Sequence, residues 1–402
     1  IEEFALGRTA GAGPIGAFGY CTGQRTGKKR PGEMVGFLPV VGSLMLAIGY
    51  TVVVGWIFKY TFMALSGGLY GLGADMNAIV DTFNAAAPGS DSLPQAVGMM
   101  VSGGLFSVGN SAWQIVGLVV SLAIIAMGIA GGIEKANKIM MPVLFFLFVV
   151  LGVYIFFLPG SGTGYSYIFR LSPAGLLDWK VWIFAFGQAF FSLSVAGNGS
   201  VIYGSYLGKN EDLVASARNV AVFDTMAALL AAFVIIPAMA AGGGDLSTSG
   251  PGLMFIYLVN VFNAMPGGQV VGMVFFVCVL FAGVTSLINL YETPVAALQE
   301  RLGFKRLPAV ALIGLLGCLV SLLIQPWTSQ WMDMVSIYIC PLGAMLAGIM
   351  FFWVLQEEKG RAAVNEGARK PVSETFFVLG RFVYVPLALI ALIAGAVLGG
   401  IG

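Results

Sequence analysis

Six polar side chains interrupt apolar stretches that are long enough to cross a membrane. They are Tyr50 in the stretch 36–66, Ser192 and Ser194 in 181–206, Asp224 in 216–241, and Thr285 and Ser286 in 268–299. Hydroxyl and carboxylate oxygens are hard ligands that suit Na⁺. A carboxylate inside a bilayer is costly unless it is paired, hydrated or next to a cation. Because the chain has no histidine and no obvious buried lysine or arginine, we expect a bound sodium ion or a proton beside Asp224.

Each of these side chains also has a purely structural explanation. Tyr50 could be a packed residue with one hydrogen bond, and serine and threonine in membrane helices often bond back to the backbone or join helices. Asp224 lies a few turns from the cytoplasmic end of its span, where water could hydrate it. Gln188, Asn289 and Glu292 could serve only to cross-link helices. The functional interpretation depends on the similar depth of the polar groups beside a broken helix.

The stretch 181–206 has the wrong composition in its middle for a continuous helix. Residues 192–200 read SLSVAGNGS, in which serine, glycine and asparagine are poor helix formers or offer polar side chains. Inside hydrocarbon, an interrupted helix is tolerated only where its freed backbone groups face protein, ions or water. The stretch therefore predicts two half-helices that meet at mid-membrane, where their ends form sites for ions and for the charged ends of a small solute.

The composition places the chain among polytopic membrane proteins. Of its 402 residues, 58% are hydrophobic and 10% are charged, and the net charge is +1. This charge implies no general attraction to nucleic acid or to anionic lipid. The lack of histidine excludes Ser-His-Asp and Cys-His catalysis and histidine-based metal sites, so we expect no catalytic residues. The 4 scattered cysteines are interpreted as thiols rather than as disulfides.

Nine complete membrane spans are expected to follow a partial first one. Residues 1–8, IEEFALGR, read as the last turns of a helix that already crosses the membrane, and 9–35 as a Gly-rich basic loop. Each complete span can cross about 30 Å at about 1.5 Å per residue. The complete spans are 36–66, 113–131, 137–158, 181–206, 216–241, 268–299, 307–324, 331–355 and 375–399.

The basic residues predict the orientation. Of the 20 lysines and arginines, only Lys59, Arg170 and Lys180 fall on the side opposite to the loop 9–35, so the side of that loop is expected to be cytoplasmic. The loops 132–136, 207–215, 300–306 and 356–374 then also lie inside, and the loops 67–112 and 242–267 lie outside. The second outer loop has an apolar run between Gly-Pro punctuation, which predicts a helical hairpin that dips toward the outer vestibule.

Five short motifs are spread in order along nearly the whole chain. They are EFALGR at 3–8, GIEKANKIMMP at 132–142, GQAFFSLS at 187–194, GPGLMFIYL at 250–258 and AGVTS at 282–286. Together they resemble the neurotransmitter:sodium symporter family, the LeuT-fold amino-acid transporters. The resemblance implies an all-α polytopic membrane fold of the LeuT inverted-repeat type, with the discontinuous helix at 181–206. It implies a single transporter domain over 1–402, with the remainder of a first repeat in 1–158, a second repeat in 181–355 and an additional C-terminal helix in 375–399.

The resemblance also implies substrate contacts, residue by residue. Tyr50 would bind the substrate carboxylate, Leu46 would line the side-chain pocket, and Phe191 would close over the substrate. The remaining contacts would come from Ser192, Ser194, Gly197, Ser286 and Leu290. Gly197 stands where a bulky side chain often narrows the pocket of family members. This glycine implies room for a hydrophobic or aromatic amino acid.

Two sodium sites follow from the same resemblance. Ala282, through its backbone oxygen, would help hold one ion together with Thr285 and Ser286, and the other ion would contact Ser192 and Asp224. Asp224 stands where chloride-dependent members carry asparagine. A fixed carboxylate can replace a mobile anion near two sodium ions, so the resemblance implies a chloride-independent transporter.

The implied gates lie on either side of this site. Tyr206 and Glu300 would form the inner gate, and Asp333 would form the outer gate with support from Gln188. The sequence also departs from the family pattern. The SLSVAGNG run has alanine and asparagine where the family has two glycines, and the first helix and most of the second are missing from the pattern. We therefore expect that the chain as given lacks part of both sodium sites and the outer-gate arginine.

These residues together predict a sodium-coupled symporter of a hydrophobic or aromatic amino acid that works by alternating access and is not an enzyme. Its partners would be the amino acid, Na⁺ and the lipid bilayer, with no nucleic acid. Its location would be the cell (plasma) membrane as a multi-pass protein, in a bacterial inner membrane.

Two other functions remain open from the sequence. The first is a non-transporting truncated remnant, or an interaction protein of the same fold. The second is an intramembrane protease, because GGGD at 242–245 matches a Gly-x-Gly-Asp pattern seen around an aspartyl-protease carboxylate. That motif lies in an expected outer loop and has no Tyr-Asp partner, which argues against the protease.

Overall fold

The computed structural model describes residues 1–90, 92, 94–95, 97–99, 109–170, 172–193, 199–243, 246 and 250–398, and all regular structure in them is helical. The long helices are α3 (Arg30–Leu65), α6 (Ser111–Ala126), α7 (Glu134–Phe156), α12 (Leu213–Ala241), α14 (Gly268–Leu302), α15 (Arg306–Leu323) and α20 (Val385–Leu398). The shorter ones are α1 (Glu2–Ala10), α2 (Pro14–Thr26), α4 (Met76–Ala86), α8 (Ser161–Ile168), α9 (Pro173–Leu177), α10 (Trp179–Ser192), α11 (Gly199–Tyr206), α13 (Leu258–Ala264), α16 (Thr328–Met334), α17 (Cys340–Ile349), α18 (Glu357–Asn365) and α19 (Glu374–Leu379).

Short π-helical segments extend several of these helices. They are η2 (Ile129–Ile133), which leads into α7, η4 (Leu253–Tyr257) before α13, η6 (Val335–Ile339) and η7 (Met350–Val354) on either side of α17, and η8 (Gly380–Tyr384) between α19 and α20. Two 3₁₀ turns complete the set, η1 (Tyr70–Leu72) and η5 (Gln325–Trp327).

The predicted spans appear as helices throughout the described residues. Seven helical segments are long and apolar enough to cross a membrane, and α6 and the η4–α13 segment are shorter apolar helices. The stretch 181–206 is divided into α10 and α11, as its composition predicts. The count of nine complete spans stays a prediction. The expected loop 132–136 is wrong, because Gly128, with φ of 87°, makes the turn and residues 129–136 are already helical.

The segment 9–35 is also mostly helical, which corrects the loop that its glycines predict. α2 begins with Pro14 in its first turn and ends at Gly27, whose φ of 75° gives a left-handed C-cap. The glycines permit close helix packing, since a Cβ at Gly32 of α3 would lie 2.0 Å from the carbonyl oxygen of Phe18. Packing of α2 against α3 therefore outweighs the low helix propensity of glycine.

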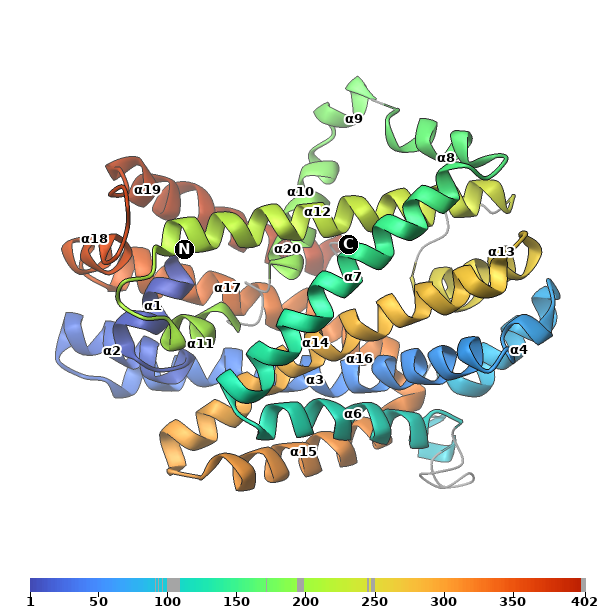
Figure 1. Ribbon diagram of the computed structural model, residues 1–402. Coiled ribbons are helices and arrows are strands. Elements are labelled where there is room, and N and C mark those ends of the chain that lie inside the picture. Colours follow the sequence, from blue (N-terminus) through green and yellow to red (C-terminus); the bar gives the residue numbers. More distant parts are fainter. Residues whose placement is uncertain are drawn as a thin grey trace.

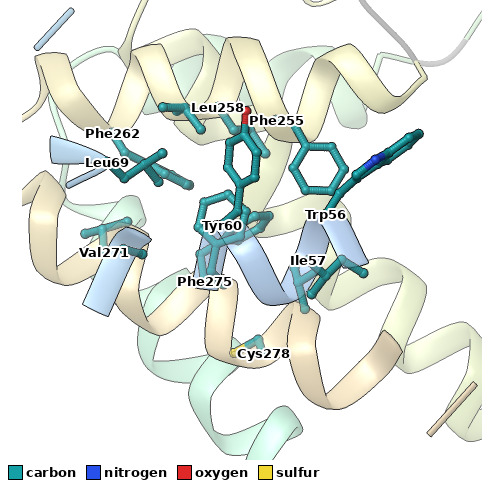
Figure 2. Packing of buried hydrophobic residues seen from close by; sticks show 14 of the residues in the cluster. Trp56, Ile57, Tyr60, Leu69, Phe255, Leu258, Phe262, Val271, Phe275 and Cys278 are labelled. Carbon is teal, nitrogen blue, oxygen red and sulfur yellow. The ribbon is translucent and has the colours of Figure 1, made fainter. Parts of the chain in front are cut away.

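A buried aromatic cluster joins the expected outer loop to the long helices (Figure 2). The ring of Phe255 in η4 lies 4.9 Å from that of Tyr60 and 6.0 Å from that of Trp56, both from α3. Phe275 of α14 belongs to the same cluster. The described part of the loop 242–267 is a single helix rather than the predicted hairpin, because it buries one apolar face along its length.

α3 and α14 pack against each other and form the centre of the molecule (Figure 1). α6 and α15 lie side by side against them, and α7 and α12 pack together. The half-helix α11 packs on α1 and also contacts α14. α10 packs on α17 and α20. The broken helix is thus held by different neighbours on either side of its break.

Candidate functional site

A cavity of about 460 Å³ lies where the broken helix faces α3 and α14. Six of the predicted substrate contacts line it: Leu46, Tyr50, Phe191, Ser192, Ser286 and Leu290. Ser194 and Gly197 lie outside the described residues. The role of all eight as substrate contacts stays a prediction. The structure brings the six together although they come from three separate segments of the chain.

The cavity wall also contains side chains that were not predicted as contacts. They are Phe4, Ser43, Leu193, Gly199, Ser200, Tyr203, Val220 and Asn289. For two of them, Ser43 and Asn289, the signal is helical spacing from a predicted contact. Ser43 precedes Leu46 by three residues, and Asn289 follows Ser286 by three, so each shares a helix face with a predicted contact. Extending the predicted contacts on these two helices by one turn would have found Ser43 and Asn289, whereas Phe4 lies on α1, where no contact was predicted.

One end of the cavity is defined by a polar contact between α3 and α14. Tyr50 is hydrogen-bonded to Ser286. Two turns earlier on α3, the Ser43 hydroxyl donates to the carbonyl oxygen of Leu290 over 2.9 Å. These bonds cross between the same two helices, so they fix the register of α3 against α14 along the cavity.

Two groups of oxygen atoms correspond to the predicted sodium ligands. The Ser192 hydroxyl donates to Oδ1 of Asp224 over 2.6 Å and connects α10 to α12. On α14, the Thr285 hydroxyl donates to the carbonyl oxygens of Phe281, at 2.9 Å, and Ala282, at 3.0 Å. Both groups consist of hard oxygen donors, the type that suits Na⁺. No group of three or more acidic, cysteine or histidine side chains that could hold a metal occurs among the described residues.

The helix that carries Asp224 is anchored at its N-terminus. Asp212 caps α12 by accepting hydrogen bonds from the backbone N–H groups of Val214 and Ala215, each at 3.0 Å. The backbone N–H of Arg369 also donates to it, over 3.0 Å. These donors, Arg369 foremost, hold the pKa of the Asp212 carboxyl below its usual range. The cap therefore stays ionised at neutral pH and fixes the start of α12.

The predicted inner-gate residues do not meet each other. Tyr206 donates to Oε1 of Glu292 over 2.7 Å, whereas Glu300 accepts from the backbone N–H of Gly13 at 2.8 Å and 3.0 Å. Glu292 is fully buried and pairs with Arg306, with 2.7 Å between Nη2 and Oε2. Sequence reasoning treated Glu292 only as a possible helix cross-link and missed Arg306. A carboxylate inside an apolar span needs a cation nearby, and this requirement could have pointed to Arg306.

The two predicted outer-gate residues lie at the surface of the molecule. Gln188 and Asp333 are both exposed, and no hydrogen bond between them is recorded in the described part of the chain. Gly244 and Asp245 of the GGGD motif lie outside the described residues.

Comparisons with known proteins agree on one family. The family model described as the sodium:neurotransmitter symporter family matches residues 2–366. An uncharacterized sodium-dependent transporter of Methanocaldococcus jannaschii is 28% identical over 380 residues, which cover 91% of this chain and 73% of the relative. One of Bacillus subtilis is also 28% identical, over 411 residues, which cover 97% of this chain and 84% of the relative. The crystal structure of MhsT in complex with L-phenylalanine superimposes with a TM-score of 0.78 at 26% identity, covering 98% of this chain and 87% of MhsT.

Proposed function

Because the chain belongs to the sodium:neurotransmitter symporter family, a family of secondary transporters and not of enzymes, we propose that it takes up a hydrophobic or aromatic amino acid together with sodium. The family makes it a multi-pass membrane protein and makes sodium the coupling ion. Beyond this substrate class, we propose that the transporter is independent of chloride and works by alternating access. We also propose the repeat boundaries 1–158, 181–355 and 375–399, and a location in the plasma membrane, a bacterial inner membrane, with the basic loops inside.

The cavity between the broken helix and α3 is the observation that carries this proposal. Its middle is apolar, with Leu46, Phe191 and Leu290, and Tyr50 with Ser286 supplies hydroxyl groups at one end. A small solute with one charged end and an apolar side chain matches this distribution. The L-phenylalanine in the structure of MhsT supports the same substrate class. In this arrangement Tyr50 donates a hydrogen bond to the substrate carboxylate, and Phe191 covers the side chain.

Sodium would couple the two halves of the broken helix to the surrounding helices. Ser192 and Asp224 would hold one ion between α10 and α12, and Ala282, Thr285 and Ser286 would contribute to the other from α14. Each group supplies only some of the ligands that a sodium ion needs. Binding of the ion therefore stabilises the state in which the helices that carry the ligands lie close together. The fixed charge of Asp224 would replace chloride. Sodium then favours the state that binds substrate, and its release favours opening to the inside.

The test is equilibrium binding of labelled phenylalanine and leucine to the purified full-length protein in sodium chloride, sodium gluconate and potassium chloride. We expect saturable binding in both sodium salts and none in potassium. Equal binding in potassium would contradict sodium coupling, and binding only when sodium and chloride are both present would contradict chloride independence. No binding in any of the three salts would contradict the proposed substrate class.

A further inference from the structure

The cavity is polar at its cytoplasmic end as well as at the end formed by Tyr50. In the proposed orientation α3 runs outward and α14 runs inward. Leu46 and Leu290 therefore lie about one helical turn, roughly 5–6 Å, nearer the cytoplasm than Tyr50 and Ser286. Asn289 lies at this inner level on α14, and both it and Tyr203 of α11 line the cavity. An amino acid whose carboxylate is at Tyr50 would direct its side chain toward this pair.

The hydrogen bond between Tyr203 and Asn289 sets the orientation of the amide. The Tyr203 hydroxyl donates to Oδ1 of Asn289 over 2.5 Å. The amide oxygen is therefore the atom that faces Tyr203, and the amide nitrogen points elsewhere.

The amide nitrogen of Asn289 is left as a hydrogen-bond donor in the cavity wall. Among the residues with described positions, none accepts a hydrogen bond from it, and it does not belong to the fully buried unpaired atoms of those residues. A polar donor that remains unpaired when a ligand excludes water weakens binding of that ligand. An apolar side chain that reached Asn289 would have this effect, whereas an oxygen acceptor would pair with the amide.

Resting on the proposed function, we propose that Asn289 makes the site select aromatic amino acids whose side chain ends in a hydrogen-bond acceptor, of which tyrosine is the natural example. The amide nitrogen of Asn289 donates to the phenol oxygen, while its amide oxygen accepts from Tyr203. Leu46, Phe191 and Leu290 contact the aromatic ring. The aromatic ring provides most of the contact area with the protein, and the phenol oxygen lets the site distinguish tyrosine from phenylalanine. One hydrogen bond of this kind corresponds to about tenfold in affinity.

A purely structural role for the pair makes a different prediction. If Asn289 only joins α14 to α11 through Tyr203, then Asn289→Leu and Tyr203→Phe remove the same bond and change the affinities for tyrosine and phenylalanine equally. If Asn289 contacts the substrate, the two variants differ. Tyr203→Phe keeps the amide donor and retains the preference for tyrosine, whereas Asn289→Leu abolishes the preference.

The experiment measures displacement of labelled phenylalanine from the full-length protein in sodium chloride by tyrosine, phenylalanine and 4-methylphenylalanine. The methyl compound has the shape of tyrosine without its acceptor. We expect the unmodified protein to prefer tyrosine about tenfold over both, Tyr203→Phe to keep that ratio, and Asn289→Leu to bring it near one. The comparison of ligands in the unmodified protein needs no variant, so equal affinities for tyrosine and 4-methylphenylalanine would overturn the inference even if Asn289→Leu fails to fold.

The outcomes separate this inference from the proposed function. Sodium-dependent binding without a preference for tyrosine over 4-methylphenylalanine would overturn the selection by Asn289 and leave the transporter intact. An unchanged preference in Asn289→Leu would also overturn it. Absence of sodium-dependent binding of any amino acid would overturn both proposals together.

Discussion

Asp224 is a carboxylate whose only recorded partner in the described structure is the Ser192 hydroxyl, at 2.6 Å. Asp224→Asn keeps the shape of the side chain and removes its charge. If that charge stands in for chloride beside bound sodium, the variant loses sodium-dependent binding in gluconate by about tenfold or more and regains it when chloride is added. Sodium titrations of amino-acid binding in the two salts measure this. Ser192→Ala is the matched control, since it removes the hydrogen bond but leaves the charge, and chloride should not improve its binding.

The residues of the site were predictable to different degrees. Tyr50, Ser192 and Ser286 were found because a polar side chain inside an apolar span is conspicuous, and the structure brings them to one cavity. Asn289 was noticed for the same reason but was interpreted as a helix cross-link. It does bond to Tyr203, and only the geometry reveals its remaining donor. Arg306 was missed because it lies just beyond the predicted span, where an arginine is unremarkable until its partner is known.

At the scale of elements, close glycine packing joins α11 to α1. A Cβ at Gly204 would lie 2.5 Å from the carbonyl oxygen of Phe4, and one at Gly7 would lie 1.8 Å from that of Val201. Both obstacles are backbone atoms, which cannot move aside as a flexible side chain can. We expect Gly204→Ala to destabilise the protein by about 1–3 kcal/mol, the usual cost of overpacking, measured as a lower Tm in detergent.

Gly152 of α7 is the matched control for this prediction. The nearest atom to a Cβ there is Cγ2 of Val234, at 3.8 Å, which is an ordinary contact. Because alanine has a higher helix propensity than glycine, Gly152→Ala should leave Tm unchanged or raise it slightly. Equal losses in both variants would show that the effect is a general intolerance of substitution in these helices and not the α1–α11 contact.

The elements themselves show where sequence patterns suffice. Long apolar runs predicted the helices of the spans, because a helix pairs its backbone groups within one segment, as hydrocarbon requires. The pattern failed at residues 9–35, where the glycines predicted a loop. Gly32 instead allows α2 to approach α3. The sequence did contain signals for the ends of α2, with Pro14 in its first turn and Gly27 at its C-cap. Whether a glycine makes a loop or a close contact depends on a partner helix that the sequence does not reveal.

At the scale of the whole molecule, two tyrosine bonds join α11 to α14 at positions three residues apart. Tyr203 bonds to Asn289 at the cavity, and Tyr206 bonds to Glu292 on the cytoplasmic side. Arg306 adds α15 to this connection through Glu292, and its Nε donates to the carbonyl oxygen of Ile125 at the end of α6, over 2.8 Å. Opening a path from the cavity to the cytoplasm by moving α11 away from α14 would break both tyrosine bonds. If the basic loops lie inside, as proposed, the contacts around Glu292 close the cytoplasmic side of the cavity.

The pair of Arg306 and Glu292 gives the last prediction. Nη1 and Nη2 of Arg306 contact the carboxylate, at 3.0 Å and 2.7 Å, and Glu292 has no exposed surface. Arg306→Ala leaves a buried charge without its partner and should cost about 3–5 kcal/mol. Combining it with Glu292→Ala removes the unpaired charge, so the double variant should unfold at a higher temperature than Arg306→Ala alone. The measurement is thermal unfolding of all three variants in one detergent. A double variant as unstable as the single one would contradict the buried-charge explanation.

A stable double variant would also keep only the Tyr203 bond of the two tyrosine bonds described between α11 and α14. A cysteine placed in the cavity should then react faster with a reagent from the cytoplasmic side.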